Sequence, residues 1–158
     1  MSKATPGPTP GFLVWRLSTK WRVAVDRAVA PLGLTHAQYS LLASLLGMQR
    51  TGRQPSQRQL AEHTGLEALY VSKLARALEE AGLVERAKDP ADSRAVRLSL
   101  TDRGQQTTRR AVDVVQQLLE QLLAPLGGLD SARTEVLVAE LSTLLDTPLD
   151  VQPSDVPG

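Results

Sequence analysis

The 158-residue sequence contains no cysteine, and it has only two histidines and five aromatic residues. Without cysteine, the chain cannot form disulfide bridges, thiolate zinc sites, cysteine nucleophiles or cysteine-based redox sensors. His36 and His63 are too few for a histidine-based metal site without carboxylate help, so neither a metal nor a cofactor is expected. No apolar run approaches the roughly 18 residues needed to cross a membrane, and residues 1–10 lack the apolar core of a secretory signal. We therefore expect a cytoplasmic protein that does not bind membranes.

Charge is distributed unevenly along the chain, although the net charge is only +1. Residues 1–50 carry six Lys/Arg and one Asp, and residues 51–110 carry eleven basic and eight acidic side chains. Residues 111–158 carry one Arg and eight acidic side chains. A basic first part suggests a polyanionic partner. An ordinary solvated surface is equally compatible with this asymmetry, so the sequence motifs are needed to distinguish the two interpretations.

Two capping boxes indicate where helices begin. In such a box, a Ser or Thr accepts a hydrogen bond from a free backbone N–H, and the Gln three residues later reaches back to the cap. Thr35 with Gln38, and Ser56 with Gln59, have this spacing. Together with apolar residues at helical spacing, they predict the first three helices over residues 11–30, 36–48 and 57–63.

A glycine turn and a change of period follow the third helix. Gly65 permits a tight turn into a fourth helix over residues 68–81, and Gly82 supplies a left-handed stop at its end. Beyond Gly82, apolar residues alternate with polar ones, which predicts strands over residues 83–88 and 96–100. The turn-rich residues between them make the pair a β-hairpin.

Two more helices are expected in the last third of the chain. Thr101 caps a fifth helix that ends before Pro125, and Asp130 caps a sixth. The apolar stripes of these helices and of the first helix need a partner, and a homodimer is the economical solution; the alternative is an intramolecular bundle in a monomer. The expected organisation is a tail (1–10), a dimerisation helix (11–34), a winged helix-turn-helix domain (35–100), dimerisation helices (101–147) and a disordered tail (148–158).

The predicted fold is thus mainly α (α+β), a winged helix-turn-helix with a two-stranded hairpin as the wing. A major groove about 12 Å wide admits one helix, and the second helix of such a motif enters it. A basic hairpin tip suits the adjacent minor groove. The candidate contacts to double-stranded DNA are Ser56, Gln57 and Arg58 in the third helix, Ala68, Leu69, Tyr70, Ser72, Lys73 and Arg76 on the outward face of the fourth, and Lys88, Arg94 and Arg97 on the hairpin.

Motifs in the winged region resemble the multiple-antibiotic-resistance regulator (MarR) family. They are Gln59-Leu60-Ala61-Glu62, Gly65-Leu66, Val71-Ser72-Lys73-Leu74, Leu78-Glu79, Gly82-Leu83-Val84-Glu85-Arg86, Asp92-Ser93-Arg94-Ala95-Val96-Arg97-Leu98 and Leu100-Thr101. The resemblance covers about residues 35–104. One departure is Glu67-Ala68-Leu69, where the family often has Ser followed by polar or basic residues.

The resemblance implies a homodimer that binds a pseudo-palindromic operator, usually as a repressor, and releases it when a small, often anionic aromatic ligand binds. It also implies that Arg94 inserts into the minor groove and that Asp92, a further DNA-site residue, orients Arg94 through a charge-assisted hydrogen bond. Glu67 is expected either to cap the helix or to accept a hydrogen bond from a cytosine amino group, although its carboxylate would repel a nearby phosphate. The base preference is therefore expected to differ from that of the family.

Five residues, most of them on the first helix, are candidates for a ligand site. Trp15 and Arg22 share one face of the first helix, and with Arg16, His36 and Tyr39 they could line a pocket for an aromatic carboxylate, which Arg would bind in bidentate fashion. Core and interface packing explains the same residues without a ligand. His36 could respond to pH, or it could serve only at the surface or at a helix cap.

Other functions fit less well. Asp89 and Asp92 flank an exposed turn that offers no pocket, so acid–base catalysis is not expected, and no nucleophile elbow is present. RNA binding is disfavoured because no aromatic residues interleave with basic ones on a strand. The serious alternative is a winged-helix protein–protein interaction module that does not bind DNA sequence-specifically.

Overall fold

The computed structural model describes residues 7–150, and within this range it contains six α-helices and a two-stranded antiparallel sheet. The elements follow in the order α1 (Pro10–Val29), α2 (His36–Arg50), α3 (Gln57–Thr64), α4 (Ala68–Glu80), β1 (Val84–Lys88), β2 (Val96–Leu100), α5 (Asp102–Leu123) and α6 (Ala132–Leu145). Short 3₁₀ turns, Ala30–Leu32 and Ala124–Leu126, follow α1 and α5. The predicted tails fall largely on residues 1–6 and 151–158, which lie outside the described residues.

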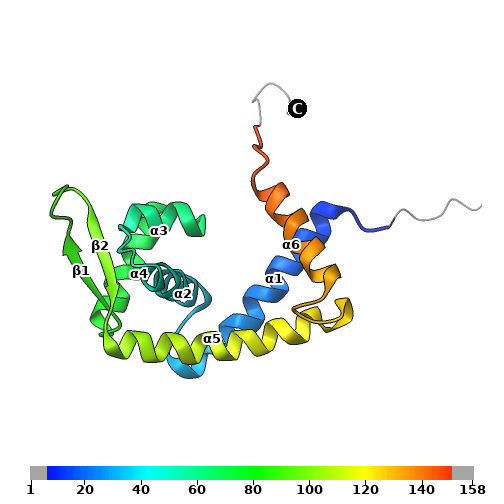
Figure 1. Cartoon of the computed structure of the whole chain (residues 1–158), viewed down its shortest axis with the longest axis horizontal. Helices are drawn as coiled ribbons and strands as arrows, with labels where there is room; N and C mark the ends of the chain where they lie inside the picture. Colours follow the sequence, from blue (N-terminus) through cyan, green and yellow to red (C-terminus); the bar gives the residue numbers. More distant parts are fainter. Residues whose placement is uncertain (1–6, 151–158) are drawn as a thin grey trace, which may run out of the picture. The chain divides into compact units, whose positions relative to one another are not determined.

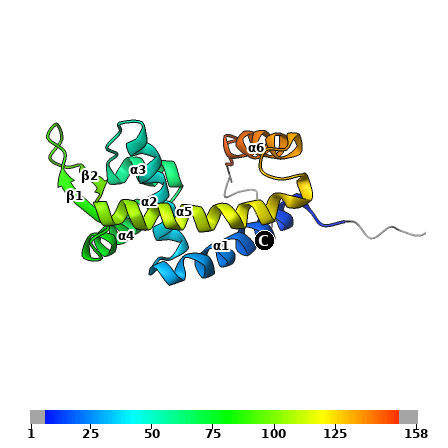
Figure 2. The same ribbon diagram turned by 60° about the horizontal axis from the view of Figure 1, so that its bottom comes forward.

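The chain divides into two units, one up to Gln116 and one from Gln117 onward, so the boundary lies inside α5. The first unit holds the helix-turn-helix and the hairpin, and Figures 1 and 2 both show the hairpin beside α3 and α4. The second unit holds the end of α5 and α6. Among the described helices, none combines the length and the hydropathy required to cross a bilayer.

Local sequence signals determine the helix starts in the first unit. Both predicted capping boxes are present: the Thr35 and Ser56 side chains accept from the N–H of Gln38 and Gln59, whose side chains accept from the cap N–H in return. Gly65 adopts a φ of 73° at the turn between α3 and α4, a left-handed conformation that only glycine adopts freely. The helix-turn-helix therefore forms where the sequence predicts it.

The core of the first unit lies between α2, α3, α4 and β2. Leu41, Leu42 and Leu45 on α2 are fully buried, as are Leu60 on α3 and Val71 on α4. Burying a leucine or valine side chain contributes about 1.5–3 kcal/mol, so this cluster anchors α4 by one face. The opposite face of α4 is left for solvent or a partner.

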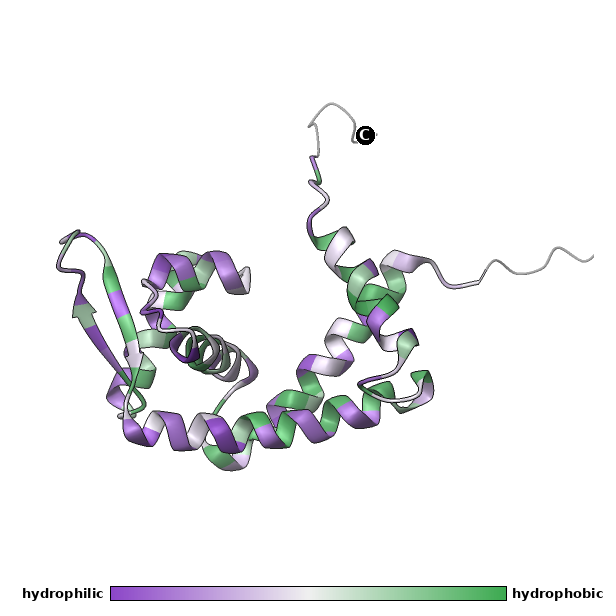
Figure 3. Cartoon of the chain, viewed as in Figure 1, coloured by the Kyte–Doolittle hydropathy of each residue, from purple (hydrophilic) through white to green (hydrophobic). Residues whose placement is uncertain are grey.

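The hairpin has the predicted strands and the predicted alternation of apolar and polar residues, and the structure adds their register. Val84 pairs with Leu100 and Lys88 with Val96, and the alternation of hydrophobic and hydrophilic residues along β2 is visible in Figure 3. Leu98 is buried, and its N–H donates to the carbonyl of Pro55, 3.0 Å away, ahead of α3. This bond joins the base of the wing to the start of the helix-turn-helix.

One predicted cap is wrong. Ser131, not Asp130, is the N-cap of α6: its hydroxyl accepts from the N–H of Thr134 and donates to the carbonyl of Leu126. Both residue types are good caps. The extended backbone at Ser131 (ψ 151°) and the bond to the preceding 3₁₀ turn select it.

Candidate nucleic-acid interface

The outward face of α4 carries the side chains predicted to read DNA. Val71, Leu74, Ala75 and Leu78 are buried in the core, which leaves the remaining positions of α4 at least partly exposed. Leu69 is 73% exposed and Tyr70 is 44% exposed. A shallow hollow on this face is lined by Glu67, Leu69, Tyr70, Ser72, Lys73 and Arg76. Five of the six residues predicted on α4 thus line one hollow that combines apolar contacts, hydroxyl groups and two cations. The sixth, Ala68, lines the hollow beside the start of α3 and the wing tip instead.

Glu67 stands directly before α4 and is its N-cap residue. Its side chain makes no capping hydrogen bond, so the carboxylate is not tied to the helix backbone. It lines the same hollow as Lys73 and Arg76. A negative charge therefore lies within an otherwise basic face, at the point where the sequence departs from the family pattern.

The start of α3 and the wing tip line a second hollow. Ser56, Gln57 and Arg58 line it from the α3 side, and Asp92 and Arg94 from the wing. Arg58 forms a surface ion pair with Glu62 at 3.4 Å, one helical turn away. Because this pair is highly exposed, it contributes little to stability and leaves Arg58 available for another anion.

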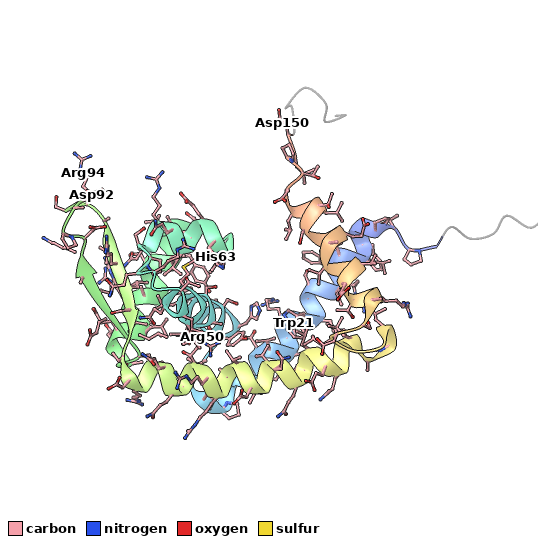
Figure 4. All side chains as sticks on the ribbon, in the orientation of Figure 1. Trp21, Arg50, His63, Asp92, Arg94 and Asp150 are labelled. Carbon is pink, nitrogen blue, oxygen red and sulfur yellow. The ribbon has the colours of Figure 1, made fainter. Side chains whose placement is uncertain are left out.

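Arg94 lies at the tip of the hairpin and extends beyond it into solvent (Figure 4). The expected bond from its guanidinium to Asp92 is not present. Instead, Asp92 Oδ1 accepts from the backbone N–H of Arg94 at 3.0 Å. A short polar side chain that bonds to the backbone two residues later stabilises a tight turn. Asp92 thus shapes the turn that carries Arg94, and the guanidinium stays free of that carboxylate.

Asp89 organises the base of the same turn, a role that the sequence analysis did not assign. Its Oδ1 accepts from the N–H of Ala91 at 2.8 Å, and its Oδ2 accepts from Arg97 Nε at 2.9 Å. The Ala91 N–H first, and the Arg97 side chain next, hold the pKa of the Asp89 carboxyl below its usual value. Arg97, a predicted DNA contact, is therefore already engaged within the wing. Lys88, which ends β1, is exposed.

The five candidate ligand residues do not gather at one place. Arg22 lies close enough to His36 to influence its charge, and the partly buried Tyr39 follows in α2. Trp15 is 68% exposed and lies seven residues before Arg22, about 10 Å along the helix axis. Arg16 stacks over the Phe12 ring at 5.8 Å. A hollow along α1 includes Arg16 but is otherwise lined by Leu13, Leu17, Thr19, Lys20, Val23, Ala24 and Arg27.

Burial and neighbouring charges shift the pKa of His36 at the start of α2, and burial shifts the pKa of Tyr39 in the same helix. Burial lowers the pKa of the His36 imidazole below 6.5, the Asp26 carboxylate opposes this shift, and the Arg22 guanidinium adds to it. Burial likewise raises the pKa of the Tyr39 phenol above its usual 10.0. In the part of the chain that the structure describes, acidic and histidine side chains form no group of three or more that could hold a metal ion.

Comparisons with known proteins agree with the fold and the motifs. A sequence model of the MarR family matches residues 32–95. The uncharacterised HTH-type transcriptional regulator YdcH of Bacillus subtilis is 36% identical over 119 residues, which cover 75% of this chain and 81% of that protein. YdcH is named as a transcriptional regulator, which is a non-enzymatic function.

Two solved structures share nearly the whole architecture. The crystal structure of the PcaV transcriptional regulator from Streptomyces coelicolor, in complex with its natural ligand, has a TM-score of 0.73 and 25% identity, and the match covers 92% of this chain and 96% of that one. The transcriptional repressor CouR, bound to a 23-mer DNA duplex, has a TM-score of 0.74 and 28% identity, covering 91% and 99%. Because the match to YdcH covers three quarters of this chain and the MarR family model matches its winged region, this chain belongs to the MarR family of transcriptional regulators.

Proposed function

We propose that this regulator is a homodimeric repressor that binds a pseudo-palindromic operator and leaves it when a small anionic aromatic ligand binds. The observation that carries the proposal is the exposed basic and polar surface of the first unit. Lys73 and Arg76 on α4, Arg58 on α3 and Arg94 on the wing are all exposed. In this proposal, α4 reads base edges in the major groove and Arg94 enters the minor groove.

The homodimer is supported by apolar side chains at both ends of the chain that the protomer leaves exposed. On α1 these are Phe12, Leu13, Val14, Trp15 and Leu17, and on α6 they are Val136, Val138, Leu141, Leu144 and Leu145. Exposed apolar surface of this extent marks interaction sites. A two-fold dimer would place two copies of α4 about one DNA turn apart, as a palindromic operator requires.

The ligand class is supported by the chemistry of α1. Leu13, Leu17 and Val23 line the hollow along this helix together with Arg16, Lys20 and Arg27, a combination that suits an apolar ring bearing a carboxylate. PcaV, which is similar in fold, was crystallised with its natural ligand. The repressor role follows CouR, which is named a repressor and was solved on DNA.

Selection of genomic fragments by the purified protein, followed by sedimentation with and without the recovered duplex, tests the proposal. We expect a dimer that retains particular fragments, loses affinity steeply as salt rises, and releases DNA on addition of benzoate or phenylacetate. A monomer with no fragment preference would contradict the proposal and favour the protein–protein module. Sequence-specific binding that no aromatic carboxylate weakens would contradict only the ligand class.

A further inference from the structure

Arg86 on β1 touches two other elements of the candidate DNA surface. Its guanidinium faces the side-chain amide of Gln57, the first residue of α3. Its Nη1 also lies 3.7 Å from Glu79 Oε1 near the end of α4. The Arg86 side chain is only 22% exposed, so these contacts are partly shielded from water. A single side chain thus links α3, α4 and the wing.

The contact decides which end of the Gln57 amide faces Arg86. A guanidinium has only N–H donors, so the amide atom that faces it must be the oxygen. In that orientation, Gln57 Oε1 accepts from Arg86 Nε at 3.1 Å and from Nη2 at 3.3 Å. The other end of the amide, an NH₂ group, carries two donors and no acceptor.

Gln57 also faces the candidate DNA surface. It lines the hollow shared with Arg58 and Arg94. A phosphate oxygen only accepts hydrogen bonds, so the NH₂ end of the amide attracts it and the oxygen end repels it. An amide that is already held in one orientation also loses less conformational freedom when it binds.

We propose that Arg86 is a positioning residue for DNA binding: it holds the Gln57 amide with its NH₂ group turned away from the wing strand, where it donates to a phosphate oxygen. The inference rests on the proposed function, because it requires a bound duplex. Arg86 itself contacts no phosphate in this arrangement.

A double-mutant cycle tests this role, with fluorescence anisotropy on a labelled duplex of about 30 base pairs and arbitrary sequence. Arg86→Leu and Gln57→Ala should each weaken binding about fivefold per protomer, the equivalent of one hydrogen bond. The double variant should bind no more weakly than Gln57→Ala alone. Losses that add in the double variant would contradict the proposal.

The salt dependence of DNA affinity distinguishes a positioning role of Arg86 from a direct contact between Arg86 and a phosphate. Because a neutral amide releases no counterion, the slope of log K against log salt should not change in Arg86→Leu or Gln57→Ala. Arg58→Ala, which removes an exposed neighbouring cation, is the matched control and should reduce the slope by about 0.9 per protomer. A similar reduction in Arg86→Leu would show that Arg86 contacts a phosphate itself.

Two conservative variants keep the test valid if Arg86→Leu fails to fold. Arg86→Lys retains a donor toward the amide oxygen and should restore most of the affinity. Gln57→Glu retains a partner for Arg86, so thermal unfolding should be preserved, but it offers no donor to phosphate and should bind weakly; wild-type affinity in Gln57→Glu would overturn the inference. If the wild-type protein itself fails to bind the duplex, the proposed function fails. If it binds and the cycle shows no coupling, only the role of Arg86 is wrong.

Discussion

Asp26 Oδ1 accepts a hydrogen bond from the backbone N–H of His36 at 2.6 Å, so α1 supplies a cap for the first turn of α2. The capping box of Thr35 and Gln38 occupies other groups at the same helix end, which leaves the His36 N–H for Asp26. A carboxylate at this position also interacts favourably with the positive end of the helix dipole. The bond therefore joins α1 to α2 across ten residues of sequence.

Removing this cap should destabilise the fold. Asp26→Ala leaves one backbone donor of α2 without its protein acceptor, and we expect the free energy of unfolding to fall by about 1–2 kcal/mol. Asp26→Asn keeps an oxygen acceptor and should lose less. Guanidinium chloride titration measures both. Equal stability of Asp26→Ala and wild type would show that the bond contributes nothing in solution.

His36 should make stability depend on pH. Because burial lowers the pKa of His36 in the folded protein, the unfolded chain binds the proton more readily. Stability is thus undiminished above the unfolded value of 6.5 and declines as the pH falls from there toward the folded pKa. Asp26 and Arg22 are the charged groups that act on the imidazole.

We expect the free energy of unfolding to be lower at about pH 5.5 than at about pH 7.5, and His36→Gln to reduce that difference. The bond from the backbone N–H of residue 36 to Asp26 should persist in this variant, because the imidazole takes no part in it. His63→Gln on α3 is the matched control. A pH dependence that persists unchanged in His36→Gln would assign it to other groups.

Glu67 should limit the affinity for DNA. Its carboxylate lines the hollow on the α4 face and makes no cap bond, so it stands near the expected phosphates without a structural task. Glu67→Gln should raise the affinity for a duplex about two- to fivefold at low salt, the effect of one exposed charge. Glu80→Gln, at the other end of α4, should have little effect in the same anisotropy assay. If the two variants behave alike, Glu67 does not face the DNA.

Arg94→Ala should weaken binding severely without unfolding the protein. Arg94 is exposed at the wing tip, so its loss removes one cation per protomer from the groove and lowers the salt slope by about 0.9 per protomer. Thermal unfolding should match that of the wild type. Arg110→Ala, an exposed substitution on α5, controls for the change in net charge. Unchanged affinity of Arg94→Ala at moderate salt would remove the wing from the mechanism.

Gly104 is the position at which we expect a single methyl group to be most harmful. A Cβ there would overlap the carbonyl oxygen of Leu83, which accepts the N–H of Thr101 at 3.1 Å. Gly104→Ala must displace α5 from the start of β1 and should cost about 3 kcal/mol, measured by chemical denaturation. Gly47→Ala meets no atom within 4 Å and should instead stabilise α2 by about 0.5–1 kcal/mol. Similar stability of the two variants would contradict this close contact.

The features that the sequence predicted correctly are those in which the interacting residues are only a few positions apart in the chain. The two capping boxes, the left-handed glycines 65 and 82, and the buried face of α4 all depend on spacings of three or four residues or on one residue's own backbone freedom. Such spacings are visible in the sequence because helix geometry is constant. The hairpin is predicted by other local signals, the change from helical to alternating periodicity and the turn-rich residues between its strands.

The cap of α6 shows where local reasoning becomes ambiguous. Asp130 and Ser131 are adjacent and equally plausible caps, and the bond from Ser131 to the Leu126 carbonyl decides between them. That bond exists because a 3₁₀ turn brings the chain back on itself.

The sequence alone therefore determined the secondary structure, the winged helix-turn-helix and the outward residues of α4, because these follow from periodicity and from local backbone preferences. Only the tertiary structure decided that Arg86 meets Gln57, that Asp26 caps α2, and that Asp89 rather than a phosphate engages Arg97. The first two contacts join different elements, and the third joins the connection between the strands to β2. Their partners are chosen by how helices and strands pack, and residue spacing carries no record of that packing.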